Sequence, residues 1–236
     1  MLIIAEIGLN HNGDINLAKC LAKEAKNCGA DIAKFQFFDA SQYFTPEFEW
    51  YDACMKARLS FEQAAQIKRF CDDIDIEFLA SVFDLTGVEW AEKLKMRRYK
   101  IPSRAINQKD LIKAVCDTGK DIIVALGMWD KKEFPKIITK GKVDFLYCVA
   151  KYPAMPEDLE LSKIDFSKYS GFSDHTIGID AALVAAAKGA KIIEKHFTLS
   201  KEMYGPDHAG SMDPGELREL VRISRKFEKL FQAEKK

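Results

Sequence analysis

The stretch YSGFSDHTIGIDAALVAAAKGAKIIEKHF, residues 169–197, contains one complete strand–helix–strand unit. Its two ends, YSGFSD (169–174) and KIIEKHF (191–197), are short apolar runs of strand length. Between them, DAALVAAAKGA (180–190) has a helical pattern and ends in a Gly followed by a small residue, which is a helix C-terminal signal. The unit predicts two parallel strands connected by a helix.

The same alternation runs along the whole chain. Short runs rich in Ile, Val and Phe predict eight strands, at 2–8, 31–38, 76–83, 98–103, 121–127, 143–150, 169–174 and 191–197. Helical patterns lie between most of them and after the last, at 16–30, 60–73, 84–95, 107–119, 180–190 and 214–232. Eight such units in 236 residues favour a single α/β domain over 1–236, a (β/α)8 TIM barrel rather than an open sheet.

Two segments depart from the alternation. Residues 39–59 form an aromatic-rich insertion after the second strand, and 151–168 has the pattern of a loop rather than a helix. Phe48, Trp50 and Tyr51 make the insertion either a lid over a binding site or a dimer surface, because aromatic side chains are enriched in both.

Composition narrows the class of partner. The chain has 36 basic and 36 acidic side chains, so no overall field attracts nucleic acid or a membrane surface, and we expect a small-molecule partner. Met1 leads into LIIAEIG, which has neither a basic region nor the length of a signal or spanning segment, so we expect a cytoplasmic protein. The six cysteines form no CxxC pair, which favours structural thiols over a metal cluster.

Polar residues gather where the predicted strands end. In a barrel of this type the active site lies at the carboxyl ends of the strands and in the loops that follow. The residues at these positions are Glu6, Asn10, His11, Lys34, Gln36, Ser81, Asp84, Ser103, Arg104, Lys151, Tyr152, Ser173, Asp174, His175, Glu194, His196, Asp207 and His208.

Two histidines end neighbouring strands. A single His at a strand end is usually a capping or core residue. Adjacent barrel strands are about 4.8 Å apart, so inward-pointing side chains of His175 and His196 can meet one ion, with oxygen ligands completing the shell. Two nitrogens without cysteine suit Mn, Zn, Fe or Co.

Lys34 lies within the apolar strand AKFQFF. A buried Lys is costly unless it is paired. One interpretation is an internal ion pair with Glu6 or Glu194, and the other is an ammonium group that binds an anion together with the hydroxyls of Ser81 and Ser103. Glu6 is then an acid or base, or only the partner of Lys34.

Eight motifs together carry a family resemblance. They occur in the order AEIGLNHNGD, AKFQFF, LASVFD, YKIPS, ALGM, GFSDHTIGID, EKHFT and GPDHAGSM. From about residue 2 to about residue 220 the chain resembles the barrel domain of the sialic acid synthase family, whose members condense phosphoenolpyruvate with an N-acetylated amino sugar such as N-acetylmannosamine. The combination of SDHT, EKHFT and GPDH is specific to that family.

The resemblance implies a role for each matching position. His175 and His196 match the two histidines that hold the catalytic divalent ion, usually Mn, with Mg, Co or Zn as alternatives. Glu6 matches a carboxylate proposed for proton transfer. Lys34, Ser81 and Ser103 match positions that bind the phosphate of phosphoenolpyruvate. Other substrate-binding positions are matched by Gln36, Tyr152, Ser173 and Asp207, of which Asp207 is expected to bind the sugar.

The chain departs from the family pattern at three polar contacts. Ala105 replaces a carboxylate, Ala125 a phosphate-binding hydroxyl, and Ala150 an Asn or Ser. We hypothesise that Arg104 or Lys151, both unusual here, provides the anion contacts instead. The loss of these three polar contacts also makes a metal-dependent lyase or aldolase that acts on a different acid an alternative function.

The family's C-terminal antifreeze-like domain, which lends an Arg to a partner's sugar site, has no counterpart in these residues. We therefore expect sugar recognition by the barrel's own insertion, by a homodimer, or by a separate protein with an antifreeze-like domain. A non-catalytic partner subunit is the remaining alternative.

Overall fold

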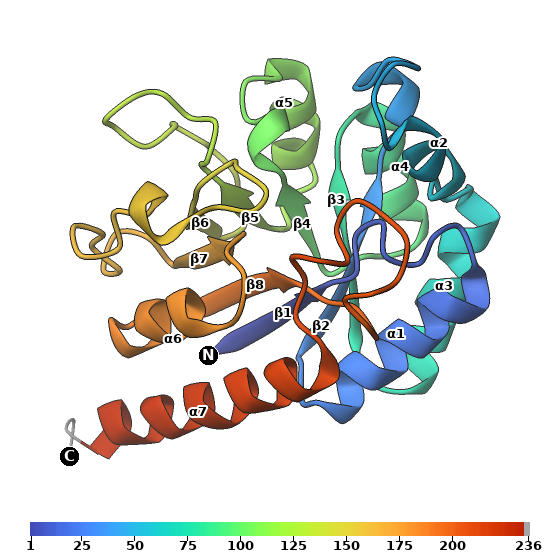
Figure 1. Ribbon diagram of the computed structural model, residues 1–236. Coiled ribbons are helices and arrows are strands. Elements are labelled where there is room, and N and C mark those ends of the chain that lie inside the picture. Colours follow the sequence, from blue (N-terminus) through green and yellow to red (C-terminus); the bar gives the residue numbers. More distant parts are fainter. Residues whose placement is uncertain (234–236) are drawn as a thin grey trace.

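The computed structural model describes residues 1–233 and contains a closed barrel of eight parallel strands (Figure 1). The strands follow one another around the barrel in chain order. They are β1 (Leu2–Glu6), β2 (Ile32–Phe37), β3 (Glu77–Val82), β4 (Arg98–Ile101), β5 (Asp121–Ala125), β6 (Val143–Cys148), β7 (Gly171–Asp174) and β8 (Ile192–His196). The predicted (β/α)8 barrel is confirmed, and each strand lies within its predicted segment.

The six expected helices are present, five in the connections between strands and one after the last strand. They are α1 (Ile15–Asn27), α3 (Phe61–Asp73), α4 (Leu85–Lys93), α5 (Lys109–Asp117), α6 (Asp180–Ala187) and α7 (Pro214–Ala233). Side chains cap several N-termini: Asp14 caps α1, Ser60 caps α3 through a capping box, and Asp84 caps α4. The insertion adds a short α2 (Tyr51–Lys56) after the 3-10 turn η1 (Ala40–Gln42).

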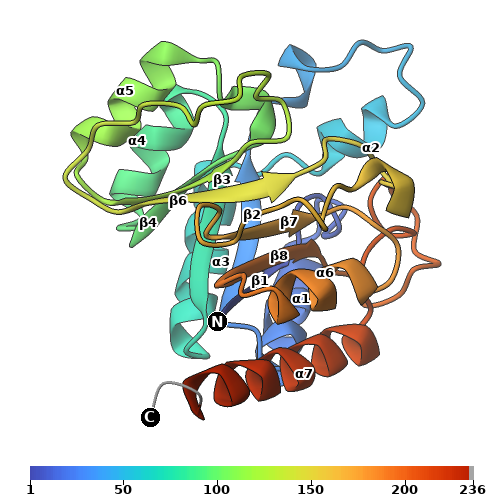
Figure 2. The same cartoon turned by 90° about the vertical axis from the view of Figure 1, so that its left-hand side faces the viewer.

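One flank of the barrel is covered by loops instead of helices. The described chain has no α-helix between β5 and β6, and only the 3-10 turn η3 (Pro156–Asp158) between β6 and β7, as the loop pattern of 151–168 predicts. In Figure 2, β6 (yellow) lies on this flank with loops beside it. Phe134 covers the outer face of β6 here, with its ring centroid 5.0 Å from that of Phe145. Pro135 is one reason why no helix forms in the β5–β6 connection.

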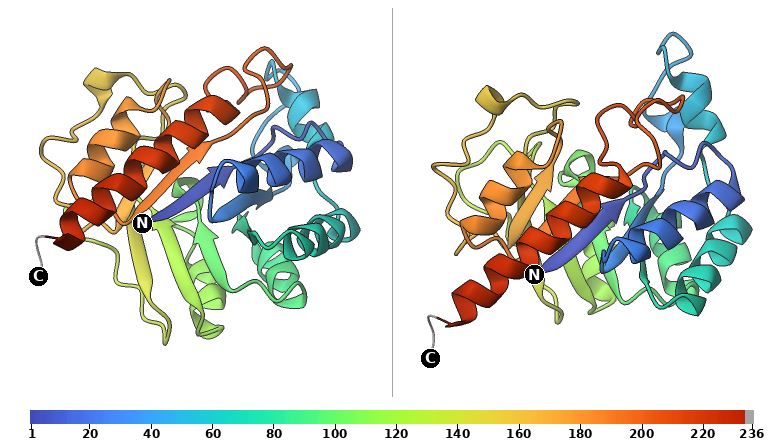
Figure 3. Two further views of the ribbon diagram at one scale, coloured as in Figure 1. Left: turned by 90° about the horizontal axis from the view of Figure 1, so that it is seen from below. Right: turned by 60° about the horizontal axis from the view of Figure 1, so that its bottom comes forward.

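Helix α7 crosses the amino-terminal end of the barrel, where the N-terminus lies beside it (Figure 3). Arg225 of α7 donates to both carboxylate oxygens of Asp31, at 2.6 and 2.7 Å, and Asp31 also accepts from the backbone N–H of Ile3 at 2.7 Å. This end is therefore tied together by α7, and the opposite end carries the loops.

The register places polar residues at one level of the barrel. Glu6 is paired in register with Lys34 and with His196, Ser81 pairs with Gln36 and Lys100, and Ser173 pairs with Glu194. Below this level the strands are packed with Ile, Phe and Ala side chains in one continuous core. The sequence of apolar strands that end in polar residues thus builds a solid barrel with a polar carboxyl end.

Candidate active site at the carboxyl end of the barrel

Two lysines and two glutamates form a charged cluster inside the barrel. The Nζ atom of Lys34 lies 3.3 Å from Glu6 Oε2 and 3.2 Å from Glu194 Oε2. The Nζ atom of Lys100 lies 2.9 Å from Glu194 Oε1. None of the four residues is more than 4% exposed. The ion-pair interpretation of Lys34 is therefore confirmed, with both glutamates as partners.

The four groups differ in how easily they change charge. Burial alone would raise the pKa of Glu194, but the ammonium groups of Lys100 and Lys34 outweigh burial and lower it. Burial raises the pKa of Glu6 and lowers the pKa of Lys100. Burial opposes the charge of Lys34 too, yet Glu194 and Glu6 outweigh it and raise the pKa of Lys34. Glu194 therefore holds the cluster together as an anion, and Glu6 is the carboxylate more ready to take up a proton.

Neutral polar groups surround this cluster. Lys34 donates to Ser81 Oγ at 3.1 Å, and the Ser173 hydroxyl donates to Glu194 Oε1 at 2.9 Å. Gln36 donates to Glu6 Oε1 at 2.8 Å. These contacts leave Glu6 Oε2 and Glu194 Oε2 as buried oxygens without a hydrogen bond of good geometry among the described residues. Buried oxygens without a hydrogen bond are uncommon in proteins, and here the Lys34 ammonium group balances their charge.

Gly8 brings the chain close to this cluster as it leaves β1. Its φ of +52° is a left-handed conformation that favours glycine. A Cβ atom here would lie 3.3 Å from Glu6 Oε1 and 3.4 Å from His196 Cε1. The exit of β1 therefore forms one wall of the site at a distance that a side chain would disturb.

His175 is oriented by a backbone carbonyl. Its Nδ1 donates to Val149 O at 2.6 Å, so Nε2 carries a lone pair that can accept a hydrogen bond or bind a metal ion. That lone pair accepts from the hydroxyl of Tyr152 at 2.9 Å, and the two rings are stacked with centroids 4.0 Å apart. Burial lowers the pKa of His175 to about 3, so the imidazole is neutral at physiological pH.

His196 faces the same space from β8. Its ring centroid is 6.1 Å from that of His175, and its Nδ1 lies 3.7 Å from Asp207 Oδ2. Burial lowers the pKa of His196 and raises the pKa of Asp207. Nδ1 of His196 is buried and has no hydrogen-bond partner within the described residues.

This donor set fits a divalent cation. Metal ligation requires neutral imidazoles, and a backbone carbonyl that orients one of them is the usual supporting contact. His175 and His196 supply two such nitrogens, and the Asp207 carboxylate is adjacent to one of them. Residues 1–233 contain no group of three or more His, Cys, Asp or Glu side chains arranged to hold an ion, so water or substrate oxygens would complete the shell.

A cavity of about 150 Å³ opens beside these histidines. Its walls come from the loops after β6, β7 and β8. The lining residues are Tyr152, Pro153, Asp174, His175, Ile177, His196, Pro206, Asp207, Ala209 and Gly210. The structure thus brings Tyr152, His175, His196 and Asp207 together at one opening, next to the charged cluster.

Three further predicted residues, Ser103, Arg104 and Lys151, lie around this opening, and the Ser103 hydroxyl is 3.6 Å from the sulfur of Cys148, which is 3.8 Å from His175 Nδ1. Ser103 accepts from the backbone N–H of Gly127 at 3.0 Å. The exposed Arg104 lies over the rings of Tyr43 and Phe44, at 5.6 and 5.5 Å from their centroids. Lys151 pairs with Asp158 at 2.6 Å. Both basic residues that are unusual in this chain therefore have partners of their own at the rim.

Lys100 is the site residue that the sequence analysis missed. It stands between Tyr99 and Ile101 in a four-residue strand and is 2% exposed. The signal was a buried Lys as in β2, but it was weaker because Arg98 is in the same strand. Its register neighbour Ser81 was recognised, and the pairing of β3 with β4 brings Lys100 to the same level.

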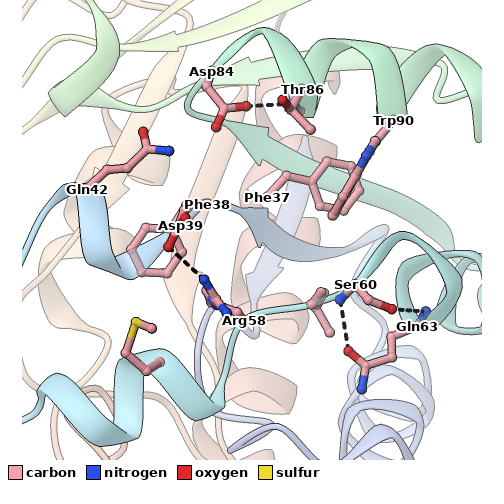
Figure 4. Close-up of a pocket in the computed structure, with 13 residues that line it drawn as sticks. Phe37, Phe38, Asp39, Gln42, Arg58, Ser60, Gln63, Asp84, Thr86 and Trp90 are labelled. Carbon is pink, nitrogen blue, oxygen red and sulfur yellow. Dashed lines mark hydrogen bonds and ion pairs between the residues drawn. The ribbon is translucent and has the colours of Figure 1, made fainter.

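A larger cavity of about 420 Å³ lies outside the barrel, between the insertion and the start of α4 (Figure 4). Phe37, Phe38 and Trp90 line it (Figure 4). Its charged groups are engaged with other parts of the protein: Arg58 donates to Asp39 at 2.9 Å, and Asp84 accepts from the N–H of Gly87 at 2.7 Å. No histidine lines this cavity, so the convergent titratable groups lie at the barrel mouth.

Within the described residues no helix is long and apolar enough to cross a membrane.

Known proteins resemble this chain over nearly its whole length. The N,N'-diacetyllegionaminic acid synthase of Campylobacter jejuni is 34% identical over 255 residues, which takes 97% of this chain and 76% of that protein. The N-acetylneuraminate-9-phosphate synthase of Homo sapiens is 34% identical over 253 residues, 96% of this chain and 70% of that protein.

Solved structures agree with the sequence relatives. The crystal structure of N-acetylneuraminic acid synthetase from Leptospira borgpetersenii serovar Hardjo-bovis, in complex with citrate, matches with a TM-score of 0.87 and 31% identity over 98% of this chain and 84% of that one. The model of the NeuB family matches residues 21–236. Since that match takes most of the chain, and relatives above 30% identity are covered over more than two thirds of their length, this protein belongs to the NeuB family.

Proposed function

We propose that this protein condenses phosphoenolpyruvate with an N-acetylated amino sugar, or a related aldose, to form a nonulosonic acid and inorganic phosphate. The observation that carries the proposal is the convergence of two buried lysines and two neutral histidines at one end of a barrel whose relatives are legionaminic and sialic acid synthases. A dianionic substrate suits the first pair, and a polarised carbonyl suits the second.

A divalent metal ion, with Mn as the proposed species, would be held by His175 and His196. When bound, it acts as a Lewis acid on the aldehyde oxygen of the open-chain sugar. The two imidazoles are already neutral, and the Val149 carbonyl orients one of them, so binding the ion requires little proton loss at these ligands.

The interior lysines would bind the acid substrate. Lys34 and Lys100 supply two ammonium groups in a water-poor environment, with the hydroxyl of Ser81 beside Lys34. Charge-assisted hydrogen bonds to phosphate and carboxylate oxygens are strong in such surroundings. Ser103, Ser173 and Gln36 are proposed to position the same substrate.

Carbon–carbon bond formation joins C3 of phosphoenolpyruvate to the aldehyde carbon, whose oxygen becomes a hydroxyl. Water adds at C2 and the C–O bond to phosphate breaks, so that a keto group remains. Of the two protons of this water, one ends on the new hydroxyl and the other on the released hydrogen phosphate. Glu6 is proposed to move a proton near the reacting carbons, because burial raises its pKa above its ordinary value and Gln36 fixes its orientation. Asp207 and Tyr152 are proposed to bind polar groups of the sugar.

The test is phosphate release from phosphoenolpyruvate by the purified chain with Mn, over a panel of N-acetylhexosamines and aldose phosphates. The proposal predicts phosphate release that requires both the metal and one aldose, with a matching keto-acid product. His196→Ala is the inactive control, and His11→Asn, at a buried histidine outside the site, is the matched active control.

A metal-dependent lyase or aldolase is the second candidate, because Ala105 and Ala125 are buried and the neighbouring Arg104 contacts aromatic rings. Such an enzyme would cleave or condense an acid without releasing phosphate, and the same assay distinguishes the two functions.

We also propose a cytoplasmic location. We further propose that a second copy of the chain, or a separate protein with an antifreeze-like domain, covers the exposed rim near Tyr204.

A further inference from the structure

We propose that Asn10 and Ser211 are positioning residues that hold Asp207 over the mouth of the site and thereby set the affinity for the sugar. The inference rests on the proposed function for its kinetic consequence, and on the hydrogen bonds of the described residues for its structural part. Neither residue faces the charged cluster or the two histidines as a ligand.

Asn10 connects the exit of β1 to the loop after β8. Its carboxamide, 1% exposed, donates one hydrogen bond to Phe197 O and one to Ser211 Oγ, both at 2.9 Å. These partners are 187 and 201 residues away along the chain. One buried side chain therefore fixes two points of a loop that the local sequence does not constrain.

Ser211 passes the constraint to Asp207. Its hydroxyl, also 1% exposed, donates to the backbone carbonyl of Asp207 at 2.6 Å. A hydroxyl has one proton, so it must accept from Asn10 while it donates to Asp207. The direction of the chain of hydrogen bonds is thus fixed, and it runs from the first loop to the backbone that carries the Asp207 carboxylate.

Asp207 needs this support because its own side chain has little. Within residues 1–233, the one basic group within 4 Å of its carboxylate is His196, at 3.7 Å. A carboxylate without a rigid side-chain contact takes its place from its backbone. A shift of that backbone would misplace the proposed sugar contact while leaving the lysines on β2 and β4 where they are.

Asn12 offers a matched control in the same exit loop. Its carboxamide donates to Tyr204 O at 2.9 Å in an exposed contact, and its Oδ1 lies 3.4 Å from His208 Nε2, so it joins the same two loops without touching Asp207 or Ser211. If any hydrogen bond between the two loops sufficed, then the removal of either Asn would have the same effect.

The experiment compares Ser211→Ala with Asn12→Ser, using Mn-loaded enzyme. Ser211→Ala removes both hydrogen bonds of this hydroxyl and is expected to raise KM for the amino sugar about tenfold, while KM for phosphoenolpyruvate and the Kd of Mn change less than about twofold. Ser211→Thr, which keeps the hydroxyl, should restore the sugar KM, and Asn12→Ser should leave it unchanged.

A double variant tests whether Ser211 acts through Asp207. In Asp207→Ala protein, the further change Ser211→Ala should have no effect on the sugar KM, since it acts through Asp207. Additive losses, or an equal rise of both KM values, would overturn the proposal.

Hydrogen exchange keeps the structural part testable if the wild-type chain shows no synthase activity. Ser211→Ala should then speed amide exchange in 205–212 with a fall in Tm of no more than about 5 °C, and Asn12→Ser should have no effect on that segment. An unchanged exchange rate there would refute the positioning role separately from the proposed function.

Discussion

The interior of the barrel end and its rim both carry positive charge, but the cations in the two regions differ in their partners and in their exposure to solvent. Inside, Lys34 and Lys100 lie within 3.3 Å of two glutamates and are shielded from water. At the rim, Arg104 lies over two aromatic rings and Lys151 pairs with Asp158 while 60% exposed. In the interior, the interaction free energy of a paired charge and the free-energy cost of an unpaired charge are both far larger, because solvent does not screen them. The comparison therefore predicts which cations matter for the substrate.

The largest effect is expected from breaking the interior cluster. Glu194→Leu leaves two buried ammonium groups without their shared carboxylate, and the free energy of unfolding should fall by about 3–5 kcal/mol. Chemical denaturation with urea checks this. A loss below about 1 kcal/mol would place these charges in the same class as the rim.

Removing one proposed metal ligand should weaken metal binding. His196→Ala is expected to raise the Kd of Mn at least about a hundredfold, because one of two nitrogen donors is lost. Electron paramagnetic resonance of free Mn measures this without any substrate. His208→Gln, at a buried histidine whose Nδ1 bonds to Thr198, should bind Mn like the wild type.

Acid should destabilise the protein through a histidine outside the cluster. Burial lowers the pKa of His11 to about 4, below its ordinary value of 6.5. The unfolded chain then binds the proton first, so stability falls as pH drops from about 6.5 towards 4. His11→Asn should remove about 3 kcal/mol of this pH dependence. Equal pH dependence of unfolding in the two proteins would contradict a neutral, buried His11.

The smallest effects are expected at the rim. Arg104→Ala should cost about 0.5–1 kcal/mol of stability through the lost ring contacts, and Lys151→Ala about 0–1 kcal/mol. Thermal unfolding of the two variants gives these values. A larger loss for Lys151→Ala than for Glu194→Leu would reverse the comparison.

The position in the barrel of the strand-borne half of the candidate site follows from the sequence. Glu6 and His196 end their strands, His175 follows β7, and Lys34 lies within β2, so the alternation of apolar strands and helices fixes their level in the barrel. Lys100 follows the same rule and was detectable. Its strand, RYKI, is only four residues long and also contains Arg98, so Lys100 was less conspicuous than Lys34 in β2.

The loop-borne half could not be predicted in the same way. The contact of Arg104 with Tyr43 and Phe44 depends on how the insertion folds back over β4, which no local pattern encodes. The hydrogen bonds of Asn10 join residues almost 200 positions apart. Periodicity reports which face of an element is buried, whereas these contacts depend on the closed barrel that brings the first and last loops together.

The measurement that tests the central claim most directly is the affinity for phosphoenolpyruvate of Lys100→Met and Arg104→Met, by calorimetric titration of the Mn-loaded proteins. The interior account predicts at least about a tenfold rise in Kd for Lys100→Met, from the loss of a buried charge-assisted contact, and less than about a twofold change for Arg104→Met. Unchanged binding by Lys100→Met, with a loss confined to Arg104→Met, would contradict it and place the anion site at the rim.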